Sequence, residues 1–149
     1  MLTYSRNKSV GVQKQGEDRR VVSGVLEDEL YAMQIEISVH WPTLTIDAVQ
    51  ARMKRFTTLT CPAAGGVFEN ATGWKIDTAL DGRIKKELGR NGCRHMAALM
   101  IDCCRGLVRA EFIRDLRSAL AENPTMDKAA FVKDFHGRYP DLVGYLSLK

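Results

Sequence analysis

The fold is decided by residues 31–40, YAMQIEISVH. Every second position carries an apolar or aromatic side chain, and the positions between them are polar or small. The apolar or aromatic residues are Tyr31, Met33, Ile35, Ile37 and Val39. A period of two is typical of a β-strand that buries one face. Trp41-Pro42 follows, and proline cannot donate to a strand ladder, so we predict that the strand ends there.

Further strand patterns lie on both sides of this stretch. Residues 20–26, RVVSGVL, are short and β-branched, and an acidic turn follows at 27–29. After the turn at Trp41-Pro42, apolar residues alternate at 44, 46 and 48, and the phase then moves to 49, 51 and 53. A phase change of one residue within a strand indicates a β-bulge. Residues 20–56 are therefore predicted to form a sheet, and residues 1–19 a loosely ordered arm or an edge strand.

The rest of the chain, residues 61–136, has helical periodicity. Gly73 and Gly89 are expected to end the first two helical segments, and Asn123-Pro124 the longest one. The expected helical segments are 61–72, 77–88, 94–121 and 125–136. We predict one α+β domain, 1–149, in which a three- or four-stranded antiparallel meander is followed by helices packed on one of its faces.

Composition is that of an ordinary globular chain, with 149 residues, 45% of them hydrophobic and 27% charged. There is no secretory signal pattern, and no apolar run approaches the roughly 18 residues that span a bilayer. We therefore expect a cytoplasmic protein that does not enter a membrane. In that compartment cysteines are free thiols or ligands rather than disulfides. The four are Cys61, Cys93, Cys103 and Cys104.

The net charge of +4 raises the question of a nucleic-acid surface. Four arginines, at 105, 109, 114 and 117, could line one side of the longest helix, but Glu111 and Asp115 are mixed among them. No aromatic residues are interleaved that could stack on bases. We expect a solvated, mildly basic face and no binding of nucleic acid. A protein partner is expected instead.

The chemistry is concentrated in residues 92–96, GCRHM, where a thiol and an imidazole occur together at a predicted helix start. A helix N-terminus offers unpaired N–H groups and positive potential, which favour the thiolate form of a cysteine. Within one continuous helix, side chains two residues apart point about 200° away from each other. Cys93 and His95 therefore converge only if Cys93 lies before the first turn. Gly92 makes that bend plausible because glycine tolerates positive φ.

Geometry separates the four cysteines. Cys103 and Cys104 lie roughly 12 to 16 Å further along the helix axis, so they cannot bind the same metal as Cys93 and His95. Cys103 falls on an apolar stripe and is expected to be a buried small hydrophobe, with Cys104 half exposed beside it. Cys61, before Pro62 at another helix start, can reach the same end of the sheet as Cys93.

The resulting set, Cys61, Cys93 and His95 with one open position, suits zinc or an iron–sulfur cluster, and Asp102 is a possible supporting residue. The alternative is that Cys93 is a packed capping residue and His95 a satisfied core or surface histidine. The sequence contains no CxxC pair that would favour metal binding over this alternative.

The order of these elements resembles a bacterial family of uncharacterised domains over about residues 20–115. The segments that carry the resemblance are Arg52 to Phe56, CPAA at 61–64 through Phe68, GWKI at 73–76 and, most specifically, the Gly-Cys-x-His motif at 92–95. More remotely, the chain is similar to NifU/IscU-type iron–sulfur scaffolds and SufE-type sulfur acceptors. That similarity implies a site at Cys61 and Cys93, although the middle cysteine of the scaffolds is missing and a histidine follows Cys93.

These observations lead to one main expectation and two alternatives. The main one is a small accessory protein that binds a metal or sulfur through Cys61, Cys93 and His95. The first alternative is a non-catalytic protein-interaction module with structural cysteines, which would dock a partner through the basic helix face or an exposed strand edge. The second is a small enzyme for an aromatic or thioester substrate, with Cys93 as nucleophile and His95 as base.

Overall fold

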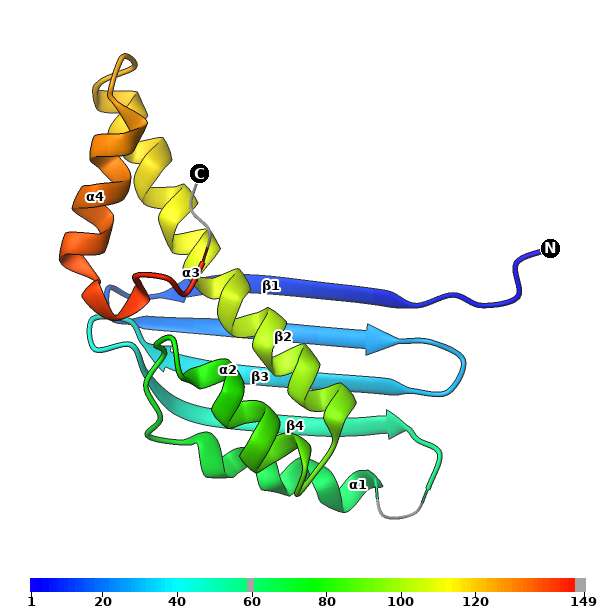
Figure 1. Ribbon diagram of the computed structural model, residues 1–149. Coiled ribbons are helices and arrows are strands. Elements are labelled where there is room, and N and C mark those ends of the chain that lie inside the picture. The colour runs from blue at the N-terminus through cyan, green and yellow to red at the C-terminus, as the bar shows by residue number, and fades with distance from the viewer. Residues whose placement is uncertain (59–60, 147–149) are drawn as a thin grey trace.

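The computed structural model describes residues 1–58 and 61–146 and contains a four-stranded antiparallel sheet with helices on one face (Figure 1). The strands follow one another in space in their chain order: β1 (Asn7–Gln15), β2 (Arg19–Glu27), β3 (Ala32–His40) and β4 (Thr45–Arg55). The predicted α+β meander is confirmed, with four strands. The N-terminal region supplies the edge strand β1.

The helical part begins directly after the sheet. Its elements are α1 (Cys61–Ala64), a 3-10 helix η1 (Gly65–Ala71), α2 (Leu80–Arg83), a π-helical turn η2 (Ile84–Gly89), α3 (Arg94–Glu122), α4 (Lys128–Arg138) and a 3-10 turn η3 (Pro140–Leu142). The longest helix ends one residue after its predicted end. The segment predicted at 77–88 begins later, because Asp77 forms a turn in which its carboxylate accepts the Ala79 N–H at 2.9 Å.

The period of two in β3 corresponds to the buried face of the sheet. Four alternating side chains of this strand are at most 1% exposed, namely Met33, Ile35, Ile37 and Val39. Ser38 is also buried, on the opposite face, where its hydroxyl accepts a hydrogen bond from Arg19 at 2.9 Å. The sequence pattern therefore identified the core face of the strand that decides the fold.

The predicted bulge lies in β4. Ser38 pairs with Ala48 while Val39 pairs with Ile46, so Asp47 is the extra residue. The bulge moves the buried position from Ile46 to Val49. Ala48, which the alternation placed in the core, is exposed because it follows the bulge.

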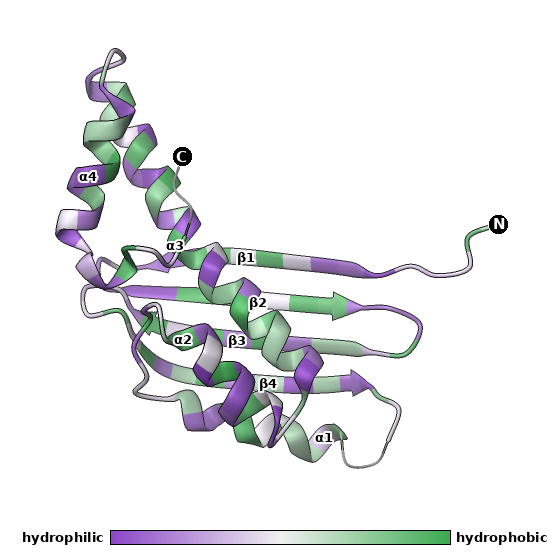
Figure 2. Ribbon diagram, in the orientation of Figure 1, coloured by the Kyte–Doolittle hydropathy of each residue, from purple (hydrophilic) through white to green (hydrophobic). Residues whose placement is uncertain are grey.

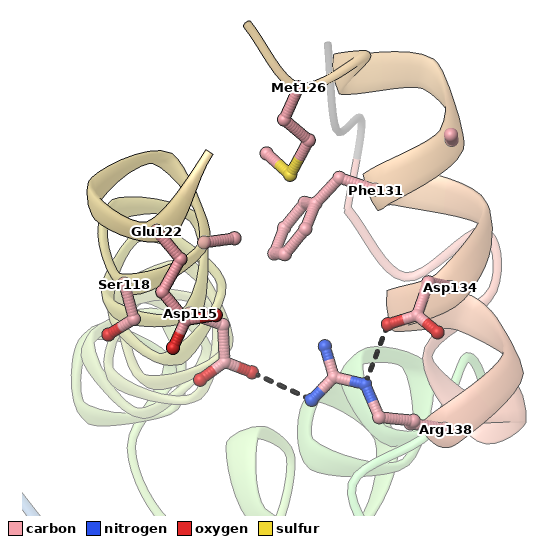
Figure 3. Close-up of a pocket in the computed structure, with 9 residues that line it drawn as sticks. Asp115, Ser118, Glu122, Met126, Phe131, Asp134 and Arg138 are labelled. Atoms are coloured by element: carbon pink, nitrogen blue, oxygen red, sulfur yellow. Dashed lines mark hydrogen bonds and ion pairs between the residues drawn. The ribbon is translucent and has the colours of Figure 1, made fainter. Parts of the chain in front are cut away.

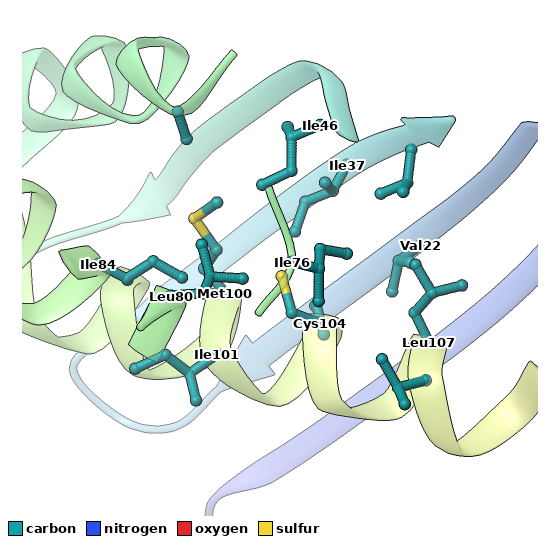
Figure 4. Packing of buried hydrophobic residues seen from close by; sticks show 14 of the residues in the cluster. Val22, Ile37, Ile46, Ile76, Leu80, Ile84, Met100, Ile101, Cys104 and Leu107 are labelled. Carbon is teal, nitrogen blue, oxygen red and sulfur yellow. The ribbon is translucent and has the colours of Figure 1, made fainter. Parts of the chain in front are cut away.

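Helix α3 crosses the sheet and, together with α2 and η2, encloses the core (Figures 1 and 4). Figure 4 shows Val22, Ile37 and Ile46 of the sheet in the same cluster as Met100 and Leu107 of α3. Cys104 belongs to this cluster and is only 1% exposed. The expectation that Cys104 is half exposed is therefore wrong, because α3 is covered on a second side by α2 and by the segment around Tyr145.

The end of α3 and α4 form a helical hairpin that projects from the sheet (Figure 1). Its inner side contains stacked rings, with Phe112 5.4 Å from Phe131 and 5.2 Å from Phe135 between centroids. Figure 2 shows that the hairpin mixes hydrophilic and hydrophobic residues along both helices. Among the residues that the structure describes, no helix has both the length and the apolar character needed to cross a membrane.

Candidate functional site

Cys93 is the N-cap of α3 and lies before its first turn. Its backbone is extended, with φ −135° and ψ 124°, and its Sγ accepts a hydrogen bond from the Met96 N–H at 3.5 Å. The capping sulfur thus occupies the positive end of a 29-residue helix. From sequence, the side chains of Cys93 and His95 were expected to converge only if Cys93 held this position before the first turn.

Gly92 permits this entry into α3 for a reason other than the one expected. Its φ is not positive, and the constraint is space. A Cβ at Gly92 would lie 2.8 Å from the carbonyl oxygen of Leu88 and 3.1 Å from that of Ala64. The loop before α3 therefore approaches the end of α1 closely only because residue 92 has no side chain.

Cys61 is the first residue of α1, and its thiol is hydrogen-bonded to a threonine hydroxyl. The Oγ1 of Thr58 lies 3.2 Å from the Sγ of Cys61, and the Cys61 N–H donates to the Thr58 carbonyl at 3.2 Å. The Thr58 hydroxyl lowers the pKa of the Cys61 thiol, because it can donate a hydrogen bond to the thiolate. Cys61 is half-buried, so its sulfur remains accessible.

The two cysteines line one cavity of about 450 Å³ between α1 and the loop that enters α3. Its other lining residues are mainly small or apolar, with two polar side chains among them: Thr58, Ala63, Ala64, Val67, Asn91 and Gly92. Asn91 is held in place by a hydrogen bond from its amide to the Glu87 carbonyl at 2.9 Å. The structure therefore brings together two half-buried thiols that are 32 residues apart in the chain.

The other two predicted site residues are elsewhere. The ring of His95 packs on that of Tyr31, with centroids 4.4 Å apart, and His95 does not line the cavity of the two cysteines. Asp102 forms an ion pair with Lys8 of β1 at 2.6 Å. Within residues 1–58 and 61–146, no three His, Cys, Asp or Glu side chains are grouped so that they could hold a metal ion. A metal bound by Cys61, Cys93 and His95 stays a prediction.

The remaining cysteines are buried in the core. Burial raises the pKa of Cys103 to about 12, and it also raises that of Cys104. Cys103 is 0% exposed on the apolar stripe of α3, which confirms that it packs as a small hydrophobe. The thiols therefore divide into a solvent-accessible pair and a buried pair.

Thr58 and Asn91 are parts of this site that were missed from sequence. Thr58 stands three residues before the cysteine that begins α1, a spacing at which a hydroxyl can reach back to the helix start. That spacing was an available signal. Asn91 had none, because its position depends on how η2 packs beside η1 and α3.

A different cavity, of about 480 Å³, separates α3 from α4 (Figure 3). Arg138 of α4 lies across it, 3.1 Å from Asp115 of α3 and 3.1 Å from Asp134. Met126 and Phe131 form its apolar side (Figure 3). None of the described residues that line it is a cysteine or histidine, and the Arg138–Asp115 ion pair holds the two helices of the hairpin together.

Residues 8–108 match the model of a family described as a protein of unknown function, DUF2889, and the chain therefore belongs to this family. The match includes all of the sheet except its first residue, Asn7, and both accessible cysteines, and it ends within α3, before the hairpin. Comparison with curated proteins and with solved structures gives no match. The expected membership of an uncharacterised-domain family is thus confirmed. The bacterial origin, the Gly-Cys-x-His motif as a family signature, and the likeness to NifU/IscU and SufE proteins stay predictions.

Proposed function

We propose that this protein is a small accessory protein that accepts sulfur at the cavity lined by Cys61 and Cys93. The observation that carries this proposal is that two half-buried thiols share one cavity and that a hydroxyl lowers the pKa of one of them. The thiolate is the nucleophilic form of cysteine, so a lowered pKa increases its fraction at neutral pH. Cys61 is accordingly the first acceptor.

The transfer is a thiol exchange with a persulfide donor, R–S–SH. The Cys61 thiolate attacks the outer sulfur of the donor, the S–S bond of the donor breaks, and R–S⁻ leaves with the electron pair. The product is a persulfide on Cys61, and no oxidant or reductant is consumed. A Cys93 thiolate can then take the outer sulfur from Cys61 by the same exchange, because both thiols line the cavity.

The surroundings of the cysteines suit this chemistry. Ala63, Ala64 and Val67 offer small apolar walls to a polarisable sulfur atom. His95 was predicted to act as a ligand or base. Its ring packs on Tyr31 instead of lining the cavity, so we assign it no chemical step.

A metal-binding version of the function remains a separate proposal. Cys61 and Cys93 would supply two thiolates, which zinc and iron–sulfur clusters both accept, and a tetrahedral site would need two more ligands. A partner protein or a second copy of this chain would have to provide them. Sulfur acceptance needs no such addition.

Mass spectrometry after incubation with an inorganic polysulfide tests sulfur acceptance. We expect a gain of one sulfur atom that maps to Cys61 or Cys93, that is lost in Cys61→Ser, and that persists in Cys103→Ala. The Cys103→Ala variant is the matched control, since Cys103 is buried away from the cavity. Equal modification of all four cysteines, or a gain of sulfur that persists in Cys61→Ser, would contradict the proposal.

Elemental analysis of protein purified anaerobically without chelator separates the metal version. Stoichiometric zinc or iron that disappears in both Cys61→Ser and Cys93→Ser would favour metal binding over sulfur acceptance. The His95→Ala variant reports on the third predicted ligand. Retention of metal in that variant would exclude His95 from the site.

A second candidate function, a protein-interaction module, is favoured by the edge of the sheet. β1 is nine residues long, contains no proline, and pairs only with β2 among the described strands. Its outer backbone groups could add a strand from a partner. A photo-crosslinking residue at Gln13, in the middle of β1, is expected to capture that partner. Capture of a partner only from a residue that lines the cysteine cavity, such as Ala63, would argue against docking at the β1 edge.

A further inference from the structure

A third cavity, of about 300 Å³, lies between η2 and the first turns of α3. Three of the residues that line it are basic, namely Lys85, Arg90 and Arg94. Its apolar part comes from α3, where Ala97 and Ile101 are 2% and 8% exposed. Among the described residues, this basic cavity shares no lining residue with the cavity of the cysteines, although both border the loop that enters α3.

The charge of the basic cavity is not neutralised within the part of the chain that the structure describes. No carboxylate lines it, and neither Lys85, Arg90 nor Arg94 has an ion pair or a side-chain hydrogen bond to a described residue. The nearby acids are bound to other cations. Glu87 pairs with Arg83, Asp81 with Arg105, and Asp102 with Lys8.

Three cations around one concavity create a positive potential that attracts an anion. An apolar surface beneath them favours a ligand that also carries an apolar group, since burial of that group adds to the binding free energy. The volume lies at the small end of the range for ligand pockets, about 300 to 1,000 Å³.

We infer that the basic cavity binds a small amphiphilic anion, in which a phosphate or carboxylate contacts Arg90, Arg94 and Lys85 and an apolar group contacts Ala97 and Ile101. Arginine is well suited to the anionic group because its planar guanidinium can donate two parallel hydrogen bonds to phosphate or carboxylate. A nucleic acid is disfavoured, since none of the described residues that line the cavity is an aromatic that could stack on a base.

The test is a titration of the purified full chain with 1-naphthyl phosphate, compared with neutral 1-naphthol and with inorganic phosphate. We expect 1-naphthyl phosphate to bind about tenfold more tightly than either comparison compound, because each of them lacks one of the two contacts. The affinity should fall as salt is added. Equal affinity for 1-naphthol, or no binding of 1-naphthyl phosphate, would overturn the inference.

Substitutions locate the binding. Arg90→Gln and Arg94→Gln should each weaken 1-naphthyl phosphate binding by about fivefold or more, since each removes a charged hydrogen-bond donor. Arg109→Gln is the matched control, because Arg109 is an exposed arginine of α3 outside the basic cavity. Equal weakening in all three variants would indicate a diffuse basic face and would overturn the inference. A short RNA that binds with the same dependence on all three arginines would do so as well.

Two further arms identify the source of the anion and separate this site from the cysteines. The first arm measures binding of octyl phosphate in solution and co-sedimentation of the protein with phosphatidic acid vesicles. Binding of octyl phosphate without co-sedimentation assigns a soluble ligand, and binding with co-sedimentation assigns a lipid headgroup. Either result supports the inference. The Cys61→Ser and Cys93→Ser variants should bind 1-naphthyl phosphate as the wild type does. Failure of sulfur acceptance would therefore leave this binding unchanged.

Discussion

At the scale of single residues, hydrogen bonds favour the ionised forms of two side chains, the thiol of Cys61 and the carboxyl of Asp28. The Thr58 hydroxyl forms a hydrogen bond with the sulfur of Cys61 and can donate to its thiolate, and the loop between β2 and β3 donates to the carboxylate of Asp28. Each contact stabilises the charged form of its acceptor. The first one bears on reactivity and the second on stability in acid.

Thr58→Val should slow the reaction of Cys61 with iodoacetamide at neutral pH. Valine has nearly the shape of threonine but lacks the hydroxyl, so the pKa of Cys61 should rise toward its ordinary value and the thiolate fraction should fall. The measurement is the alkylation rate of Cys61 as a function of pH, by mass spectrometry. Thr72→Val, in the turn after η1, is the matched control. An unchanged pH profile in Thr58→Val would show that the hydroxyl does not control the thiol.

Asp28 organises the turn between β2 and β3. Its Oδ1 accepts the N–H groups of Leu30 and Tyr31 at 2.8 and 2.7 Å, and its Oδ2 accepts from Arg6 at 2.9 Å. The Tyr31 N–H makes the largest contribution that holds the pKa of Asp28 well below its ordinary value of 3.8. From sequence, residues 27–29 were predicted only as an acidic turn.

The stability that Asp28 confers should be lost in acid. Its folded pKa is lowered, so the contribution is complete above the unfolded pKa near 3.8 and declines as the pH falls through that value toward the folded pKa. Urea unfolding at about pH 6 and about pH 3 should show a smaller pH dependence for Asp28→Asn than for the wild type. Asp47→Asn, at the exposed bulge of β4, serves as a control for the loss of one acid. An equal pH dependence in wild type and Asp28→Asn would contradict this assignment.

At the scale of elements, the position of α3 on the sheet depends on a missing side chain in β2. A Cβ at Gly24 would lie 2.4 Å from the Sγ of Cys103 and 3.2 Å from Leu99. Gly106 of α3 is in similar contact with Val10 of β1, where a Cβ would lie 2.9 Å away. Close packing of this kind leaves no room for an added methyl group.

Gly24→Ala should therefore lower the free energy of unfolding by about 1 to 3 kcal/mol, the usual cost of overpacking a core. Gly11→Ala in β1 is the matched control, because no heavy atom lies within 4 Å of its Cβ position. The double variant Gly24→Ala/Cys103→Ala should be more stable than the sum of the two single changes predicts, since the alanine at 103 removes the clashing sulfur. Strict additivity in urea unfolding would place the strain elsewhere.

At the scale of the whole molecule, one buried ion pair links the sheet to the outer half of α3. Arg20 of β2 and Glu111 of α3 are 4% and 2% exposed, and the guanidinium donates from both Nε and Nη2 to the carboxylate. Arg114 adds a second cation to Glu111 at 3.1 Å. The pair lies where α3 leaves the sheet and the hairpin begins, so it helps to fix the direction of the hairpin.

Glu111→Ala should cost about 3 to 5 kcal/mol, because it leaves the buried guanidinium of Arg20 without its counter-ion and bonded, among the described residues, only to the backbone carbonyls of Glu17 and Arg19. Asp102→Ala is the matched control: it also removes an ion pair between a strand and α3, but that pair is solvent-exposed and should contribute at most about 1 kcal/mol. Replacing both buried partners, as in Arg20→Met/Glu111→Met, should recover most of the loss. Similar unfolding free energies for Glu111→Ala and Asp102→Ala would show that burial of the pair has little energetic effect.

The sequence by itself determined strands β2 to β4, the bulge in β4 and the extent of α3, because these follow from local signals: side-chain period, a change of phase, and glycine, proline and capping residues. It left β1 open between a loosely ordered arm and an edge strand. It also placed Cys93 at the start of α3 and Cys103 in the core. Only the tertiary structure decided which residues meet at the site. Periodicity shows which face of an element is buried but not which element covers it.

The packing of η1 on β4 and of η2 on α3 brings Cys61 and Thr58 to Cys93, whereas His95 contacts Tyr31 instead. The same packing covers Cys104 and gathers the three cations of the basic cavity on one side of α3. Contacts between residues that are distant in the chain depend on the angles and distances at which elements pack. Those quantities are set by the whole core, and no single segment of the sequence contains them.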